Sequence, residues 1–506
     1  MSFPAALLPA APSWYPGHMH SFNKMLPSLL ARTDIVLELR DTRMPLTSIN
    51  PTFESTVARW RADRRMKPGS CCERLIVYGK QDLVGRWGVK PFHRAMQHLH
   101  PHEKFIFASG HDPKAMKKLH GLLVNVAKKH VHSHTELNVT IIGMPNVGKS
   151  TLLNGLRSAG MPGPQPKALR TSALPGMTRA LSTRLKLYIG NVKSKAWDKS
   201  KGEPEASIDE ADDLADKGCP IYAFDTPGLM LPFLGNGFQG AERGIKLGLI
   251  VKEGMYDYDF LATYLIHRFN FLQPESPAYL ELLAPKSHST SKDPQRIQHV
   301  LDKLDLAPGT QLDAEEFLRL LAERRGMTLK GGRVDIGRAA QWLVEWWRER
   351  GGAVVGGRTR RGWGFDFEFT DDDGAEEEPH VVVKGHEDDL FRAELDLAER
   401  SPRGVAQSDV EAEIQYHPYE DLPSVEDNQP ATHHQARSAT LEEIDLSEED
   451  EIQLRMESII SRHFSAIAEE TRSGGRISAT REKNVARAEA TAKRKAKVLE
   501  KLAKQS

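Results

Sequence analysis

The sequence predicts an α/β domain built on a largely parallel sheet, followed by a small all-α domain and a long charged extension. Over residues 14–240, short apolar runs that end in turn residues alternate with amphipathic stretches. That alternation is typical of a parallel sheet covered by helices. Residues 241–352 have helical periodicity, and charge dominates from residue 353 onward.

Five apolar runs predict buried strands, and they lie at 35–39, 75–78, 105–107, 139–142 and 221–224. The run 183–189 alternates apolar and polar residues, which predicts an edge strand with one solvated face. The stretch 190–218 is rich in Lys, Glu and Asp, and we interpret it as a surface insertion.

Two helix starts are visible in residues 241–352. Asp313 and Glu316 form a capping-box pattern before an apolar face, and Asp335 precedes a second helical run that contains Trp347. We expect Trp347 and its neighbour Trp346 to pack in a core.

Charge is distributed unevenly along a chain whose formal net charge is zero. Residues 366–421 hold 19 acidic against four basic residues, whereas residues 471–506 hold 11 basic against three acidic residues. We expect an acidic disordered linker over 353–440 and a partly helical extension with a basic tail over 441–506.

Composition excludes two classes of protein. In 506 residues, no stretch approaches the roughly 18 uncharged apolar residues of a membrane span. Three cysteines cannot form a disulfide framework or a four-cysteine zinc site, so we expect a reducing compartment.

The strongest motif is Gly-x-x-x-x-Gly-Lys-Ser, from Gly143 to Ser150. It follows a predicted strand and precedes a helical run, which is the context of a phosphate-binding P-loop. Its backbone N–H groups would surround phosphate oxygens, with Lys149 reaching the β- and γ-phosphates and Ser150 binding Mg²⁺.

Four further short elements complete a nucleotide site. Asp225 begins an Asp-x-x-Gly element whose carboxylate would serve Mg²⁺ and whose Gly228 amide would meet the γ-phosphate. Thr178 fits the threonine that joins Mg²⁺ when the γ-phosphate is present. Lys80-Gln81-Asp82 fits the Lys-x-Asp element that reads guanine, and Ala108-Ser109 fits the loop that supports the base.

These elements occur in a rotated order, because the guanine-reading ones precede the P-loop. This order resembles the circularly permuted ribosome-assembly GTPases, and residues 14–19 (WYPGHM) and 34–45 resemble their N-terminal signature and first strand. The resemblance covers about residues 13–350, leaving 1–13 as an N-terminal segment. It is nearest the family's bacterial and mitochondrial branch, whose N-termini are compact.

The resemblance implies an α/β P-loop GTPase domain over 14–240, an RNA-binding helical domain over 241–352, and GTP and Mg²⁺ as ligands. It implies that His18 is catalytic, since Leu229 stands where other GTPases have a water-orienting Gln, and that Asn146 binds K⁺. The residues expected at the nucleotide are Lys80, Gln81, Asp82, Ala108, Ser109, Asn146, Val147, Gly148, Lys149, Ser150, Thr151, Thr178 and Gly228; those at Mg²⁺ are Ser150, Thr178 and Asp225.

One residue departs from the family pattern, because Gly79 stands where an Asn normally precedes Lys-x-Asp. In the family, the amide of that Asn contacts the base and ties this loop to the P-loop. Without it, we expect guanine binding to be weaker by about 1 kcal/mol.

The implied function is a GTP-hydrolysing factor, stimulated by the ribosome, which binds the maturing large ribosomal subunit and its rRNA as a monomer. The resemblance implies that the protein acts in the mitochondrial matrix. It leaves open whether the protein lies peripherally on the inner membrane. Residues 1–13 contain no Arg or Lys, so the sequence gives no clear import signal. Three alternatives stay open: a nucleotide-binding rRNA scaffold with negligible turnover, a cytosolic or nucleolar assembly GTPase, and a P-loop kinase or transferase.

Overall fold

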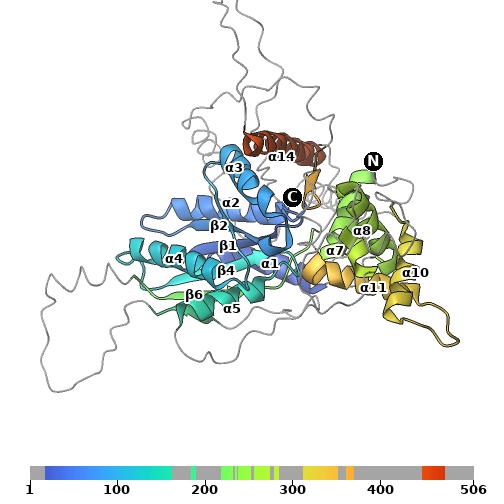
Figure 1. Cartoon of the computed structure of the whole chain (residues 1–506). Coiled ribbons are helices and arrows are strands. Elements are labelled where there is room, and N and C mark those ends of the chain that lie inside the picture. Colours follow the sequence, from blue (N-terminus) through green and yellow to red (C-terminus); the bar gives the residue numbers. More distant parts are fainter. Residues whose placement is uncertain are drawn as a thin grey trace, which may run out of the picture.

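The computed structural model describes ten segments of the chain, which are residues 17–161, 184–189, 218–231, 234–235, 237–251, 256–273, 278–283, 311–351, 361–369 and 447–472. Their arrangement is shown in Figure 1. The predicted strand 183–189, helix starts 313 and 335, and helix within 441–470 fall largely in these segments, whereas the insertion 190–218 lies almost wholly outside them.

A six-stranded sheet in the order β3-β2-β1-β4-β6-β5 forms the centre of the molecule. Its strands are β1 (Ile35–Asp41), β2 (Glu73–Gly79), β3 (Lys104–Phe107), β4 (Leu137–Gly143), β5 (Leu185–Tyr188) and β6 (Ile221–Asp225). All neighbours pair in parallel except β5, which is antiparallel at the edge. The predicted α/β fold class is therefore confirmed, and each predicted strand has its counterpart.

The strand order reverses direction between β1 and β4. The chain moves outward from β1 to β3 and then returns to place β4 beside β1. Ligands of open α/β sheets bind at such a reversal, beyond the carboxyl ends of the strands. The residues that follow β1 and β4 are therefore placed on either side of the candidate site.

Helices cover both faces of the sheet. The helices of this domain are α1 (Gly17–Leu30), α2 (Pro51–Arg65), α3 (Val89–Leu99), α4 (Pro113–Lys129) and α5 (Lys149–Gly160), with short 3-10 turns η2 (Gln81–Leu83) and η3 (Arg86–Gly88). Right-handed crossovers require α4 and α5 to share one face, where they pack on each other, and α2 and α3 to share the other.

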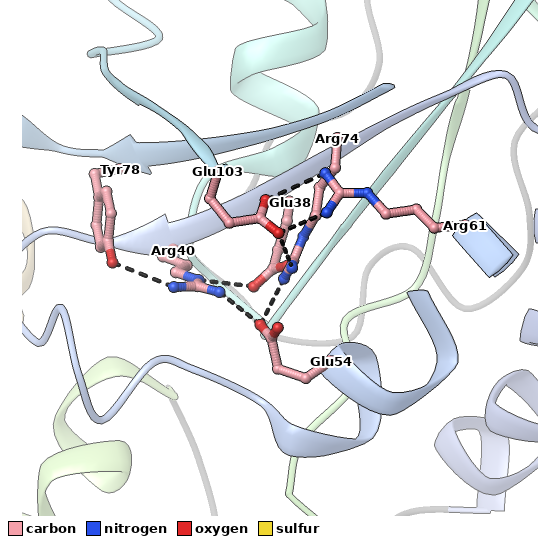
Figure 2. Close-up of polar contacts among 7 residues, drawn as sticks. All are labelled: Glu38, Arg40, Glu54, Arg61, Arg74, Tyr78 and Glu103. Carbon is pink, nitrogen blue, oxygen red and sulfur yellow. Dashed lines mark hydrogen bonds and ion pairs between the residues drawn. The ribbon is translucent and has the colours of Figure 1, made fainter. Parts of the chain in front are cut away.

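The face covered by α2 carries a buried network of charges, drawn in Figure 2. Glu38 of β1 accepts hydrogen bonds from Arg40 (2.7 Å) and Arg74, and Glu54 of α2 accepts from the same two arginines (2.6 and 2.5 Å). Burial would raise the pKa of Glu38, but Arg40 and Arg74 bring it down to about 2. Glu103 extends the network, as an acceptor from Arg74 (3.4 Å).

The second domain is helical, with its own apolar core. It contains α7 (Gly237–Ile250), α8 (Tyr258–Leu272), η4 (Ala278–Leu283), α10 (Ala314–Arg325), α11 (Ile336–Trp346) and a π-helical turn, η5 (Trp347–Gly351). The predicted caps are present, because Asp313 accepts from the Glu316 amide (2.8 Å) and Asp335 from the Arg338 amide (2.9 Å). Trp347 is buried, whereas Trp346 is only partly buried.

The described residues 361–369 are folded, which corrects the linker prediction for them. They form a hairpin of β7 (Gly362–Trp363) and β8 (Phe367–Glu368). Four alternate aromatic side chains are buried in it: Trp363, Phe365, Phe367 and Phe369. The high average acidity of 366–421 concealed this short alternation.

The helix α14 (Glu448–Arg472) packs across α3, far from it in sequence (Figure 1). Its buried side chains Ile452, Met456, Ile460 and Phe464 join an apolar cluster with Phe92 and the hairpin. Among the described residues, no helix combines the length and hydropathy that a membrane crossing requires.

Candidate nucleotide-binding site

The P-loop connects the end of β4 to the start of α5. Gly148 has a φ of 101°, the left-handed conformation that glycine adopts without strain. Gly143 has a φ of 151°, and a Cβ there would lie 2.4 Å from the Leu39 carbonyl oxygen. A larger residue would therefore displace the loop from the sheet edge, which explains why glycine begins it.

Lys149 points back into the loop that precedes it. Its ammonium group donates to the carbonyl oxygens of Gly143 (3.2 Å) and Met144 (2.8 Å). Burial lowers the pKa of Lys149 to about 8, against the opposing effect of Asp225. A bound phosphate would favour the charged amine, so this lysine is suited to an anion.

Ser150, in the first turn of α5, faces Asp225, the last residue of β6. The Ser150 hydroxyl donates to Asp225 Oδ2 at 2.6 Å, and Asp225 is 1% exposed. A hydroxyl and a carboxylate oxygen are the ligand types that Mg²⁺ prefers in nucleotide sites. Two of the three predicted Mg²⁺ ligands are thus adjacent, and their residue types fit the ion.

The Asp-x-x-Gly segment lies directly against the P-loop. A Cβ at Gly228 would be 2.6 Å from Pro145 Cα, so only glycine permits this approach. The Leu229 amide donates to the Gly143 carbonyl (3.3 Å), and the Leu229 side chain is fully buried in the core. Leu229 therefore does not line the phosphate site.

The predicted guanine-reading segment lies beside the P-loop, although 66 residues separate them. Lys80 has a φ of 60°, and its Nζ donates to the Asn146 carbonyl oxygen at 2.6 Å and to Asp41 Oδ2 at 3.0 Å. Gln81 and Asp82 begin a 3-10 turn that follows, and Asp82 is exposed.

The predicted base-supporting loop reaches the same place from β3. Ala108 and Ser109 are buried, and a Cβ on the next residue, Gly110, would lie 2.9 Å from Thr151 Cγ2. Val147 is buried in the core, so only its main chain is available to a ligand.

Of three further predicted residues, Asn146 alone has a described side chain. Thr178 lies outside the described residues, and His18 is the second residue of α1, with a side chain that is also outside them. Asn146, the predicted potassium ligand, uses its side-chain amide to donate to the Ile250 carbonyl at the end of α7 (3.3 Å).

A link that the sequence did not predict joins the site to the helical domain. Asp41, which accepts from Lys80, also accepts from Arg43 Nη2 (2.8 Å). Arg43 donates to the Arg348 carbonyl (3.1 Å) and lies 4.5 Å from the Trp347 ring centroid. The acidic-basic turn 41–43 was visible in the sequence, but nothing there paired it with Arg348.

Arg348 completes this link at the carboxyl end of α7. Its guanidinium donates to the carbonyls of Gly248 (3.0 Å), Leu249 (2.8 Å) and Val251 (3.0 Å). The last carbonyls of a helix lack partners within it, and a cation there is stabilised by the helix dipole. Arg348 and Asn146 therefore both cap the carboxyl end of α7.

Comparison with known proteins agrees with this geometry. Residues 138–267 match a family model described as "50S ribosome-binding GTPase". The chain carries a GTPase domain. Its relatives include mitochondrial GTPase 1 of Schizosaccharomyces japonicus, 24% identical over 357 residues, which are 66% of this chain and 87% of the relative.

A second relative is mitochondrial ribosome-associated GTPase 1 of Bos taurus, 26% identical over 51% of this chain and 65% of the relative. A solved structure described as GNP-bound YlqF from T. maritima aligns over 66% of this chain and 95% of its own, with 17% identity and a TM-score of 0.29. The resemblance to permuted GTPases is confirmed by the relatives, and the GTPase domain holds Lys80 against a P-loop that follows it in sequence.

Proposed function

We propose that this protein is a GTP-hydrolysing assembly factor for the large ribosomal subunit of mitochondria. It would couple hydrolysis to a late maturation step and to its own release. The observation that supports this most strongly is the convergence of Lys80, the P-loop and the Ser150–Asp225 pair at one end of the sheet. The proposed location and partner come from the relatives' names, which refer to mitochondria and to the ribosome.

In this proposal each part of the site has one task. The P-loop amides and Lys149 hold the phosphates, Ser150 and Asp225 hold Mg²⁺, and Asp82 accepts hydrogen bonds from guanine. Bound Mg²⁺ supplies charge neutralisation at the phosphates. Thr178 would join the metal in the GTP state.

The catalytic group is proposed to be His18, at the start of α1. Leu229 is fully buried and has no polar group with which to orient water, so another residue must do so. Asn146 is proposed to bind K⁺ through its side-chain oxygen, because its amide nitrogen is the atom that donates to Ile250.

Nucleotide state would reach the helical domain by two routes. The Asp-x-x-Gly segment leads into α7, and Asn146 and Arg43 contact the end of α7 and residue 348 directly. Movement of the P-loop on loss of the γ-phosphate would therefore disturb the cap of α7. We propose that this domain binds rRNA and that the disturbance weakens its hold.

The deciding experiment compares GTP and ATP binding and turnover with and without purified large subunits. We expect GTP to be preferred and its turnover to rise on the subunits, and His18→Ala to lose the stimulated rate while GTP binding is kept. Equal binding of ATP would reject the guanine site, and unchanged stimulated turnover in His18→Ala would reject the catalytic assignment.

A scaffold with negligible turnover is the second candidate, favoured by the buried Leu229 and by Gly79 in place of Asn. It predicts tight GTP binding with no release of phosphate on subunits. Ser150→Ala distinguishes the enzyme from the scaffold. In an enzyme it should abolish Mg²⁺-dependent phosphate release on subunits, whereas in a scaffold the wild-type chain and the variant should both release none.

A further inference from the structure

The helical domain carries a stack of three side chains that takes no part in the nucleotide site. The rings of Trp342 and Trp346, one turn apart on α11, lie 6.4 Å apart with an interplanar angle of 20°. Arg325, the last residue of α10, places its guanidinium carbon 3.3 Å from the Trp342 ring centroid. The three groups therefore form a continuous ladder of planar surfaces.

This ladder is accessible from solvent. Arg325 is exposed, and both tryptophans are only partly buried where they pack on the domain core. The next tryptophan, Trp347, is 1% exposed and stacks on Phe365. Of these three tryptophans, one is in the core and two remain partly exposed, which a purely structural role would not require.

The turn beside the ladder is strongly basic. Between residues 324 and 338 there are five basic residues and one acid, Asp335. All five basic residues are exposed, and they are Arg324, Arg325, Lys330, Arg333 and Arg338. The Asp335 carboxylate accepts from the Arg338 main-chain amide as a helix cap. Figure 1 shows the α10–α11 turn at the outer edge of the molecule, away from the sheet.

We propose that the ladder formed by Arg325, Trp342 and Trp346 binds an unpaired nucleotide of RNA, with phosphates held by the basic turn. Bases stack on aromatic rings and on guanidinium planes, and unpaired bases are the ones free to do so. This inference rests on the proposed function, since it names how the helical domain would hold rRNA. Stacking tolerates any base, so the site selects single strands rather than a sequence.

The test measures binding of the full-length chain to a fluorescent single-stranded oligoribonucleotide and to a duplex of equal length. We expect the single strand to bind more tightly, and Trp342→Ala to weaken it about 5- to 100-fold, the range for loss of one stacked base. Arg325→Ala should weaken it less, and Trp342→Phe should keep most of the affinity because it keeps a ring. Arg319→Ala is the matched control, since Arg319 is an exposed α10 arginine paired with Glu323.

Trp342→Phe and Arg325→Ala also guard against misfolding, since neither removes as much packing against the domain core as Trp342→Ala does. The inference is overturned if all stack variants bind the single strand as the Arg319→Ala control does. It is also overturned if they lose large-subunit binding while keeping oligonucleotide binding, because the ladder would then be a protein contact. If the chain binds the oligonucleotide through the stack but does not bind large subunits, the proposed function is rejected. The proposed RNA site would not be affected by that result.

Discussion

Lys80 donates a hydrogen bond to the main-chain oxygen of Asn146 at 2.6 Å, which joins a loop early in the chain to the P-loop. This contact supports a guanine-nucleotide site assembled in permuted order. We predict that Lys80→Met lowers GTP affinity about 10- to 100-fold, because hydrogen bonds to charged groups contribute about 1.5–3 kcal/mol. Titration with a fluorescent GTP analogue measures the change.

Asp41 keeps its contact with Arg43 in this variant, so a general loss of folding is not expected. Lys90→Met is the control, because Lys90 is an exposed lysine on α3 paired with Glu449. If Lys80→Met binds GTP as the control does, Lys80 does not position the nucleotide loop.

Gly79→Asn should restore the family's Asn-Lys-x-Asp element and raise GTP affinity. A Cβ at Gly79 would lie 3.3 Å from the Val147 carbonyl oxygen and 3.2 Å from Leu39 Cδ1, so it fits after a small adjustment. One added hydrogen bond of about 1 kcal/mol corresponds to about a fivefold gain. Gly79→Ala separates the amide from the Cβ: a gain of equal size in both variants would mean that the amide contributes nothing.

The parts of this fold that the sequence predicted are those set by local pattern. The strands are recognisable because both faces of the sheet are buried, so β1 and β4 contain short apolar runs, 35–37 and 141–142, beside few polar residues. The caps at Asp313 and Asp335 follow from side chains that bond within three residues. In the site, the proximity of Ser150 and Asp225 was predictable because each belongs to a motif that follows a strand at the same end of the sheet.

What the sequence did not predict depends on contacts between distant segments. Asn146 and Ile250 are 104 residues apart, and Arg43 and Arg348 are 305 apart. Neither pair has a local signal, since Arg348 is one of many arginines and its partners are main-chain carbonyls. The hairpin 361–369 was hidden for another reason, because its aromatic alternation is shorter than the acidic stretch that surrounds it.

The buried charges on the α2 face predict a specific dependence on pH. The pKa of Glu38 is about 2 in the folded chain, below its ordinary 4.5. Its stabilising contribution is therefore complete above about pH 4.5 and is lost as the pH falls toward about 2. Glu38→Gln should remove this part of the acid sensitivity in urea unfolding measured at several pH values.

At neutral pH the same variant should lower the free energy of unfolding by about 3–5 kcal/mol, because Arg40 and Arg74 lose a buried partner. Glu323→Gln provides the comparison, since its pair with Arg319 is exposed and should contribute less than about 1 kcal/mol. Equal costs for the two variants would show that the network contributes no more than a surface pair.

Docking of α14 on α3 should depend on apolar burial rather than on its ion pairs. Met456 is fully buried in the cluster with Phe92 and the hairpin, so Met456→Ala should cost about 2–5 kcal/mol. Glu449→Ala removes an exposed partner of Lys90 and should cost less than about 1 kcal/mol. Hydrogen exchange of the α14 amides measures both effects: Met456→Ala should strip their protection, and high salt should not. Loss of protection in salt alone would mean that the acidic side chains of α14, and not its apolar face, hold the helix in place.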